Sequence, residues 1–247
     1  MPSMWRQVRL VRPQDLNPTT GDILLFMTHL TFPSQNDDEP LKSRMSPFAL
    51  VVVGMCGSGK SSVAAYLKRQ GWPVVRFGDI TIRELERRGL AVCEANERRV
   101  RQELRAEHGM DAYAKMLLPT IRDHLARGPV VLDGLYSWSE YKYLLGNLQE
   151  RLLVVAVVAP RKLRYARLAS RPERPLSPEE AFSRDLAEIE TLEKGGPIAM
   201  ADETILNTGS LEQLEQAVEV IIRERVASAQ EGCERGASAQ EGCERGT

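Results

Sequence analysis

The sequence lacks the features that mark several specialised classes of protein. Its four cysteines include no C-x-x-C pair, so we expect neither a zinc motif nor a disulfide framework. The longest apolar run, residues 152–160, is far shorter than the roughly 20 residues that a helix needs to cross a bilayer. The N-terminus shows no compact apolar segment before a small-residue cleavage site, as a signal peptide would. We therefore expect a cytoplasmic protein without a membrane partner.

An excess of charge of one sign is also missing. The formal net charge is -1, so the chain as a whole attracts neither nucleic acid nor an anionic membrane, and binding to nucleic acid is not expected. His29, His108 and His124 share no spacing typical of metal ligands. The sequence contains neither the N-K-x-D motif of guanine-binding proteins nor an ABC-type signature, which argues against a GTPase and an ABC-type ATPase.

What the sequence does contain divides into a central domain, residues 47–226, and two flanking segments. Residues 1–46 carry scattered Pro, Asn, Asp and Thr without lasting periodicity, so we predict a disordered N-terminal extension. Within it, residues 22–32 could form a short strand or an amphipathic segment, and an extra functional module is the alternative for this region. Residues 227–236 recur unchanged as residues 237–246. Two copies poor in apolar residues make no solenoid, so we predict a disordered tail over residues 227–247.

Strand-like and helix-like segments alternate in the central domain. The strand-like segments are rich in Val, Ile and Leu without polar alternation, which indicates strands buried on both faces, as in a parallel sheet. This alternation predicts a doubly wound α/β fold with five parallel strands, whose ligands bind at the carboxyl ends of the strands. The predicted strands are residues 48–53, 73–77, 130–133, 152–158 and 203–206. The predicted helices are residues 61–70, 80–88, 94–107, 111–126, 137–148, 160–170, 178–194 and 210–225.

A glycine-rich motif follows the first predicted strand and leads into the first predicted helix. Residues 54–61 read G-M-C-G-S-G-K-S and match the P-loop pattern G-x-x-x-x-G-K-S. Glycines allow the backbone to approach a phosphate closely, and the N–H groups of the loop and of the helix N-terminus then point at the anion. We expect Lys60 to contact the β- and γ-phosphates of ATP and Ser61 to hold Mg²⁺. The predicted nucleotide-binding residues of this stretch are Gly54, Met55, Cys56, Gly57, Ser58, Gly59, Lys60, Ser61 and Ser62.

Two aspartates follow predicted strands and are candidates for the same site. Asp133 ends an apolar strand, the position from which a Walker B aspartate holds Mg²⁺ or its water shell. The alternative is that Asp133 only caps the following turn. Asp79 follows the second predicted strand, where it would orient an acceptor hydroxyl or act as a base. An N-cap of the helix that starts at Ile80 explains Asp79 equally well, and both roles could hold.

Two arginines and one asparagine are further candidate residues of the predicted nucleotide site. Phosphoryl transfer requires fixed positive charge on the moving group, and the guanidinium fork supplies it. Arg167 and Arg171 are four residues apart on a predicted helix that leads into the Pro-rich residues 172–178. They would share a helix face beside a lid-like loop, so they are the preferred catalytic arginines. Asn207 starts a loop that either closes over a purine or forms an ordinary turn with an N-cap at Ser210.

Six sequence blocks of the chain carry a resemblance to a known family. They are G-M-C-G-S-G-K-S at 54–61, F-G-D-I-T-I-R-E-L-E-R-R-G-L at 77–90, L-R-A-E-H-G-M-D-A-Y-A-K at 104–115, V-L-D-G at 131–134, and the blocks at 184–202 and 205–210. On these residues the chain, over residues 48–222, resembles the nucleotide kinases among P-loop proteins, particularly dephospho-CoA kinase and a related group of small kinase-like proteins. The resemblance implies a P-loop NTPase fold with a helical acceptor-binding insertion and an arginine lid. By matching position, Asp79, Arg83 and Arg105 resemble acceptor-binding residues, and Arg167 and Arg171 resemble the lid pair.

The chain also departs from this pattern at two places. Tyr136 stands where the small kinase-like group tends to carry an arginine, and the P-L-L-F-E-like turn of dephospho-CoA kinases is missing. The resemblance therefore does not assign the acceptor.

Together these features predict an ATP- and Mg²⁺-dependent phosphotransferase with Lys60, Asp79, Arg167 and Arg171 as catalytic residues. The γ-phosphoryl group would pass to a small nucleotide-like acceptor, either a nucleoside monophosphate or the ribose hydroxyl of dephospho-CoA. An anionic phosphate needs several arginines and no base, whereas a hydroxyl benefits from Asp79. The alternative from another class is an ATP-binding sensor or regulator with little or no turnover.

Overall fold

The computed structural model describes residues 47–148, 151–172 and 175–225. The predicted N-terminal extension and the tail with its tandem repeat lie outside the described residues. Both predictions therefore stay untested, and the fold described below is that of the central domain.

A five-stranded parallel sheet forms the centre of the domain. Its strands are β1 (Ala49–Val53), β2 (Val74–Arg76), β3 (Val130–Asp133), β4 (Leu152–Val158) and β5 (Glu203–Leu206). They are arranged in the order β2-β3-β1-β4-β5, and every neighbouring pair is parallel. Ala49 of β1 pairs with Val130 of β3 on one side and with Leu152 of β4 on the other. Because β1 is the middle strand, the glycine-rich loop that follows it lies at the centre of the carboxyl edge.

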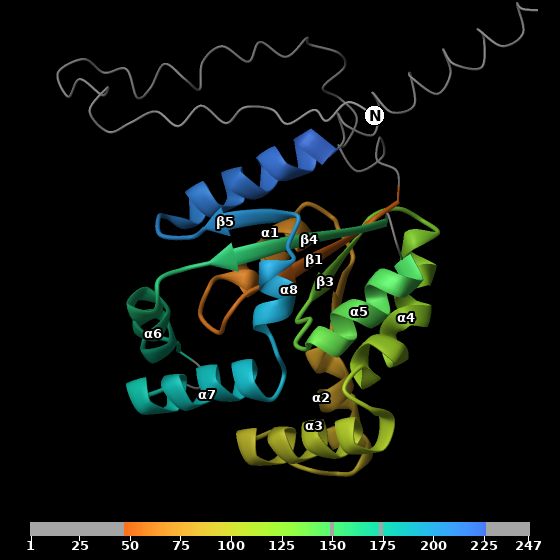
Figure 1. Cartoon of the computed structure of the whole chain (residues 1–247), viewed down its shortest axis with the longest axis vertical. Coiled ribbons are helices and arrows are strands. Elements are labelled where there is room, and N and C mark those ends of the chain that lie inside the picture. Colours follow the sequence, from red (N-terminus) through yellow and green to blue (C-terminus); the bar gives the residue numbers. More distant parts are fainter. Residues whose placement is uncertain (1–46, 149–150, 173–174, 226–247) are drawn as a thin grey trace, which may run out of the picture. The chain divides into compact units, whose positions relative to one another are not determined.

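Helices cover both faces of the sheet (Figure 1), which confirms the predicted α/β fold of five parallel strands flanked by helices. The helices are α1 (Lys60–Arg69), α2 (Gly78–Arg87), α3 (Glu94–His108), α4 (Ala112–Leu125), α5 (Trp138–Leu148), α6 (Arg161–Ala169), α7 (Pro178–Glu190), α8 (Gly195–Ala199) and a last helix at residues 211–225. On one face, Leu50 and Val52 pack against α1 and the last helix. On the other, Val51 and Val53 pack against α4 and α5. Successive side chains of a strand point to opposite faces, so an unbroken apolar strand requires this double cover.

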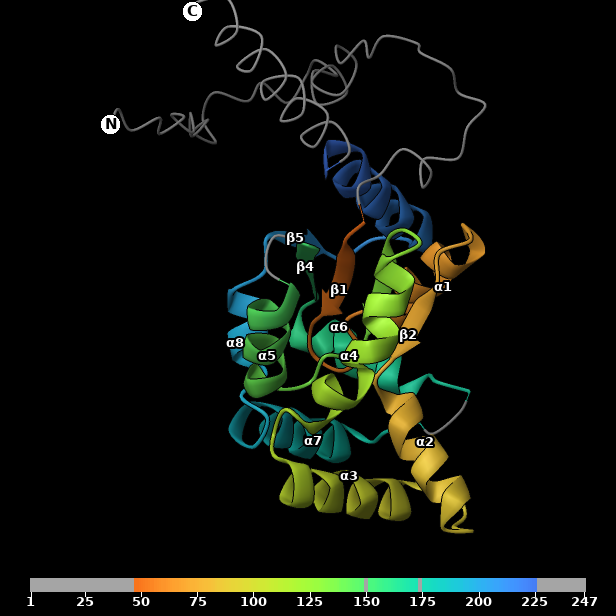
Figure 2. The same ribbon diagram turned by 90° about the vertical axis from the view of Figure 1, so that its right-hand side faces the viewer.

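Three helices lie away from the sheet and beside its carboxyl edge. Figures 1 and 2 show α2, α3 and α7 together at the end of the domain opposite the helix of residues 211–225. The ligand site expected at this edge therefore has helical walls on more than one side.

The structure differs from the sequence-based predictions in two respects. The edge strands are not buried on both faces: Leu206 of β5 is 66% exposed, and Arg76 at the end of β2 is exposed as well. The helix predicted over residues 178–194 ends at Glu190, and the short α8 follows it separately. Glu193 has a φ of 50°, a left-handed conformation that a continuous α-helix does not allow.

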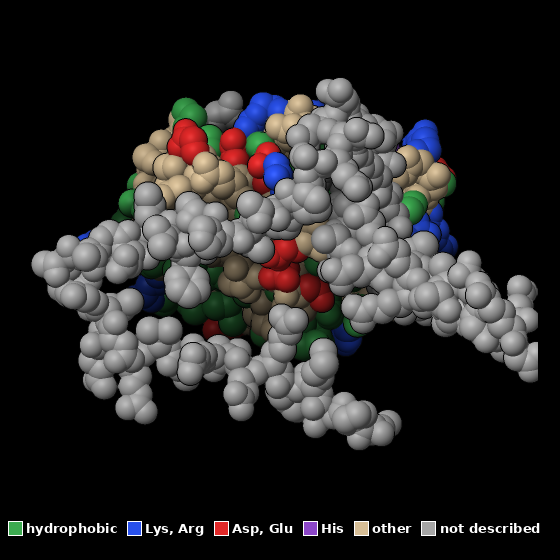
Figure 3. Space-filling view, turned by 90° about the horizontal axis from the view of Figure 1, so that it is seen from above, with side chains coloured by type: hydrophobic (Ala, Val, Ile, Leu, Met, Phe, Trp, Pro, Cys, Tyr) green, Lys and Arg blue, Asp and Glu red, His purple; other side chains and the backbone are tan. Residues whose placement is uncertain are grey.

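None of the described helices is both long and apolar enough to span a membrane. Where described side chains are visible in Figure 3, basic and acidic groups occur on the same face of the molecule. This mixture agrees with the small net charge of the sequence.

Candidate functional site

The loop of residues 54–59 connects β1 to α1 and requires glycine for its conformation. Gly54 and Gly59 have φ values of 144° and 110°, in the region that side-chain-bearing residues avoid. A Cβ atom on Gly54 would lie 2.3 Å from the carbonyl oxygen of Val157, and one on Gly59 would lie 2.2 Å from Nδ2 of Asn207. The groups packed behind the loop therefore determine its shape as much as the loop sequence does.

A buried arginine of α6 contacts the loop from behind. Arg164 is 6% exposed, and its Nη1 donates a hydrogen bond of 2.9 Å to the carbonyl oxygen of Cys56. The same guanidinium donates to both carboxylate oxygens of Asp185 on α7, at 2.9 and 2.6 Å. A bidentate pair of this kind fixes both position and orientation. Sequence reasoning missed this pair, because Arg164 lies in an arginine-rich stretch in which nothing distinguishes it from its neighbours.

Asn207 supports the same loop. The residue is 7% exposed, and its Nδ2 donates a 2.8 Å hydrogen bond to the carbonyl oxygen of Ser58. Asn207 thus lies behind the loop, and contact with a purine stays a prediction. The alternative, an ordinary turn with an N-cap at Ser210, is supported. Ser210 Oγ accepts a 3.3 Å hydrogen bond from the N–H of Gln213 at the start of the last helix.

Lys60 is the first residue of α1, and its side chain returns to the loop. Its Nζ donates a hydrogen bond of 3.0 Å to the carbonyl oxygen of Met55. Burial, followed by the charge of Lys194, lowers the pKa of Lys60 from 10.5 to about 7, against the opposing effect of nearby acidic groups. At neutral pH Lys60 is therefore close to half protonated before an anion binds.

We expect nucleotide binding to be coupled to proton uptake by Lys60. A triphosphate beside the ammonium group favours its charged form, so a lysine that is mostly neutral at pH 8 becomes protonated on binding. With a pKa of about 7 in the free protein, the uptake should rise from roughly 0.5 proton at pH 7 to roughly 0.9 proton at pH 8. Titration calorimetry with MgATP in buffers of different ionisation enthalpy measures this number.

The exposed Lys68 on the same helix provides the control. The variant Lys68→Ala should show the same proton uptake as the unchanged protein at both pH values. Uptake that does not increase between pH 7 and pH 8 in the unchanged protein would contradict the lowered pKa of Lys60.

Asp133 and Ser61 offer oxygen ligands that fit Mg²⁺. Asp133 is at the carboxyl end of β3, where burial raises the pKa of its carboxyl group and the charges of Lys60 and Arg76 partly offset that rise. Among the described residues, no group of three or more His, Cys, Asp or Glu side chains is placed to bind a metal. One carboxylate and one hydroxyl instead match an ion that completes its shell with water and substrate phosphates, as Mg²⁺ does.

A cavity of about 580 Å³ opens at the carboxyl edge of the sheet, beside the glycine-rich loop. Its volume is in the range of small-molecule sites, which is roughly 300–1,000 Å³. Residues from the loop, α1, β2, β3, α6 and α7 line it. Nine of the residues predicted from the sequence are among them: Cys56, Gly57, Gly59, Lys60, Ser61, Ser62, Asp133, Arg167 and Arg171.

Arg167 and Arg171 both reach this cavity, although not in the predicted way. The helix α6 ends at Ala169, so Arg171 lies beyond it and the two arginines do not share a helix face. Arg167 Nη2 lies 3.4 Å from Oδ1 of Asn207, and its Nη1 is buried without a hydrogen-bond partner among the described residues. That N–H group is available to an anionic ligand in the cavity.

The predicted acceptor residues on α2 do not line the cavity. The side chain of Asp79 is 47% exposed and lies 3.9 Å from the guanidinium of Arg76. Asp79 is not the N-cap of α2, because the helix begins at Gly78 and the cap position is Phe77, without a side-chain cap bond. The N-cap interpretation is therefore wrong. Arg83 is exposed on the same helix.

Arg105 also lies outside the cavity, in the interior between helices. Its side chain is 10% exposed, and Nη2 lies 3.7 Å from Oε1 of Glu140 on α5. Its guanidinium carbon is 4.9 Å from the centre of the Tyr113 ring. Arg105 therefore connects α3 to α4 and α5, and acceptor binding by Asp79, Arg83 and Arg105 stays a prediction.

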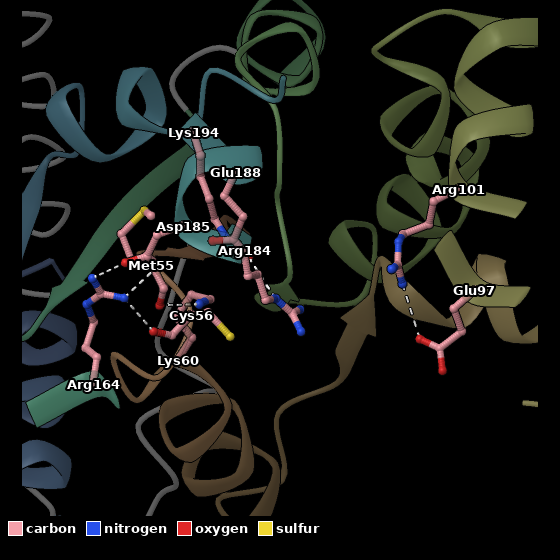
Figure 4. Close-up of polar contacts among 10 residues, drawn as sticks. All are labelled: Met55, Cys56, Lys60, Glu97, Arg101, Arg164, Arg184, Asp185, Glu188 and Lys194. Carbon is pink, nitrogen blue, oxygen red and sulfur yellow. Dashed lines mark hydrogen bonds and ion pairs between the residues drawn. The ribbon is translucent and has the colours of Figure 1, made fainter. Parts of the chain in front are cut away.

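Several charged residues of the cavity were not assigned a role from the sequence: Arg76, Arg184, Glu188 and Lys194. Lys194 and Glu188 form a hydrogen-bonded ion pair of 2.7 Å, and Arg184 Nε lies 3.4 Å from the other oxygen of Glu188 (Figure 4). Arg184 and Glu188 are four residues apart on α7, and the turn after α7 brings Lys194 to them in the folded chain.

Cys56 provides a test for nucleotide binding that requires no turnover. The side chain is 6% exposed, lines the cavity and contacts the small cluster that includes Leu168. We expect MgATP at ten times its dissociation constant to slow alkylation of Cys56 about tenfold, because the bound nucleotide blocks access. Mass spectrometry of the alkylated peptides measures the rate for each cysteine.

The exposed Cys93 is the internal control for this experiment. Its alkylation rate should stay the same with and without MgATP. Equal rates for Cys56 under the two conditions would show that the loop does not bind the nucleotide.

Comparison with known sequences finds relatives along most of the described domain. A family described as the AAA domain matches residues 50–189. A UPF0200 protein from Thermococcus gammatolerans is 35% identical over 187 residues, which cover 74% of this chain and 98% of that protein. A UPF0200 protein from Halobacterium salinarum is 37% identical over 171 residues, which cover 67% of this chain and 87% of that protein.

Comparison with solved structures finds chains whose sequence identity to this protein is lower than that of the relatives above. TT1252 from Thermus thermophilus is 26% identical with a TM-score of 0.47, and the similarity covers 73% of this chain and 98% of that one. Shikimate kinase from Acinetobacter baumannii, in complex with shikimate, is 17% identical with a TM-score of 0.48, covering 75% and 98%. The assignment of the fold rests on the strand order and the glycine-rich loop described above.

Proposed function

The chain belongs to the UPF0200 family and contains an AAA domain, and on this premise we propose that it is an ATP- and Mg²⁺-dependent phosphotransferase. It moves the γ-phosphoryl group of ATP to a small nucleotide-like acceptor, for which a nucleoside monophosphate and dephospho-CoA are the two candidates. The observation that carries the proposal is a single cavity in which the P-loop meets a surplus of cationic side chains.

The charge of this cavity fits two anionic substrates better than one. Six cationic side chains and two carboxylates line it, which leaves a net charge of about +4 when all are ionised. ATP with bound Mg²⁺ carries about -2, and the phosphate of a nucleoside monophosphate or the pyrophosphate of dephospho-CoA adds about -2. The cationic residues are Lys60, Arg76, Arg167, Arg171, Arg184 and Lys194, and the carboxylates are Asp133 and Glu188.

The described side chains supply position and charge for the transfer. Lys60 and the N–H groups of the loop bind the β- and γ-phosphates, and Arg167 directs its unpartnered Nη1 to a phosphate oxygen. Ser61 and Asp133 would hold Mg²⁺, which would supply positive charge to the phosphate oxygens.

In the reaction, an acceptor oxygen forms a bond to the γ-phosphorus while the bond to the β,γ-bridging oxygen breaks. ADP leaves with the electron pair of that bond. A phosphate acceptor needs no base, because its attacking oxygen is already ionised. The ribose hydroxyl of dephospho-CoA must lose a proton, and in that case Asp79 accepts it.

A panel of acceptors assayed with MgATP tests the proposal. Nucleoside monophosphates and dephospho-CoA are each incubated with the full-length protein, and ADP formation is compared with that of Lys60→Ala. At least one acceptor should raise ADP formation well above the variant. If dephospho-CoA alone does so and Asp79→Asn removes the effect, the hydroxyl acceptor is correct.

The same panel separates a kinase from a sensor. A protein that protects Cys56 with MgATP but forms no more ADP than Lys60→Ala with any acceptor would be an ATP-binding regulator. That result would overturn the proposed phosphotransferase while leaving nucleotide binding in place.

A further inference from the structure

A buried ion pair that no motif predicts lies at the wall of the cavity. Lys194 is 1% exposed, and its Nζ donates a 2.7 Å hydrogen bond to Oε2 of Glu188. Arg184 Nε lies 3.4 Å from Oε1 of the same carboxylate. Figure 4 shows Lys194, Glu188 and Arg184 grouped on the α7 side of the site, near Lys60. Both members of the pair line the cavity that contains the P-loop.

The backbone places Lys194 at this position. The helix α7 ends at Glu190, and Glu193 takes a left-handed conformation with a φ of 50°. The chain then turns back, so that the N–H of Lys194 donates a 3.1 Å hydrogen bond to the carbonyl oxygen of Glu188. The side-chain pair and this backbone bond therefore reinforce the same turn, and the ammonium group is held in a defined place.

We propose that Lys194 is a second phosphate-binding lysine, which contacts the γ-phosphoryl group of bound ATP while Glu188 positions its ammonium group. The inference rests on the proposed use of ATP. An ammonium group has three N–H bonds, and the hydrogen bond to Glu188 uses one of them. Another can donate to a phosphate oxygen without breaking the pair, and Arg184 gives Glu188 a second cationic neighbour.

The position of Lys194 relative to Lys60 favours this role over a purely structural one. Lys194 and Lys60 line the same cavity, so both ammonium groups lie on the wall of one site. A buried ion pair whose only role is to stabilise a turn gains nothing from a second lysine beside it. Two neighbouring cations become favourable once a polyanion lies between them, as the β- and γ-phosphates of ATP would.

Comparison of ATP and ADP binding tests the proposal. The variant Lys194→Met should bind ATP about 10- to 100-fold more weakly in the presence of Mg²⁺, because one charge-assisted hydrogen bond to the γ-phosphate is lost. Its affinity for ADP, which has no γ-phosphate, should change less than about threefold. Titration calorimetry on the full-length protein measures both dissociation constants.

Two further variants separate this role from folding. The double variant Glu188→Gln/Lys194→Met leaves no unpaired lysine or glutamate charge at the turn, and it should show the same selective loss of ATP affinity. Lys162→Met, at an exposed lysine of α6, should change neither affinity. An equal loss of ATP and ADP affinity, or no loss of either, would overturn the proposal.

The test of Lys194 does not depend on whether the protein transfers a phosphoryl group. If no acceptor is phosphorylated but Lys194→Met still loses ATP selectively, the inference holds and the proposed phosphotransferase fails. If an acceptor is phosphorylated and Lys194→Met keeps its preference for ATP over ADP, the inference fails and the proposed function stands.

Discussion

Replacing Lys60 by alanine should lower the rate of phosphoryl transfer by about 10²- to 10³-fold. Lys60 is the P-loop lysine, and the loss of one preorganised donor at a developing charge typically has an effect of about this size. The rate is measured as ADP formation at saturating MgATP, with the acceptor identified in the panel. A smaller effect, within about threefold, would show that the P-loop does not act in the reaction.

The same variant also tests the electrostatics around Lys60. The pKa of Lys60 is lowered in the folded protein to about 7, so the unfolded chain binds more protons between about pH 7 and pH 10.5. The free energy of unfolding of the unliganded protein should therefore rise with pH in this window through the contribution of Lys60. Lys60→Ala should lose that part of the rise, whereas Lys68→Ala, at an exposed position of α1, should keep both the rise and the activity.

Replacing Asp185 by alanine should destabilise the protein by about 3–5 kcal/mol. The change leaves Arg164, which is 6% exposed, as a buried cation without its carboxylate partner. Because Arg164 also contacts the carbonyl oxygen of Cys56, the P-loop should lose its support and nucleotide affinity should fall with stability. Urea unfolding measures the first effect, and titration with MgATP measures the second.

Two control variants make this prediction specific. Glu215→Ala removes the partner of Arg69 in an ion pair whose arginine is 58% exposed, and it should cost less than about 1 kcal/mol. The double variant Arg164→Met/Asp185→Leu replaces the buried pair by apolar groups and should recover most of the stability. It should not recover nucleotide affinity, because no donor remains for the loop carbonyl. Full recovery of affinity would contradict the role of Arg164 in positioning the loop.

The fold could be predicted from the sequence because the apolar pattern of each segment shows how that segment is buried. The strand of residues 152–158 is apolar without alternation, and only a position inside a parallel sheet with helices on both faces buries such a segment. The boundaries of β3, β4 and β5 agree with the predicted ranges for the same reason. The break after Glu190 was not predicted, because residues 191–194 contain no Gly or Pro that would mark the end of a helix before Glu193 turns the chain.

For the candidate site, too, one part could be predicted from the sequence and another part could not. The loop of residues 54–61 was found because it matches the P-loop pattern between a predicted strand and a predicted helix. Asp133 was found at the end of a predicted strand, and Arg167 and Arg171 at the end of a predicted helix. Asp79 was predicted from its place after the second predicted strand, and Arg83 and Arg105 were assigned by resemblance. The structure places none of the three on the cavity wall. Their role in acceptor binding therefore depends on experiment.

The sequence alone determined that this chain forms a P-loop α/β domain, because spacing and apolar periodicity are properties of neighbouring residues. Only the tertiary structure decided which charged groups surround the phosphate site. Arg164 and Asp185 are 21 residues apart, and Asn207 lies 149 residues from the Ser58 carbonyl that it contacts. Lys194 comes near Lys60 only because α7 and its terminal turn return to the carboxyl edge of the sheet. Burial and pairing of this kind depend on contacts between distant segments, and no pattern along the chain encodes them.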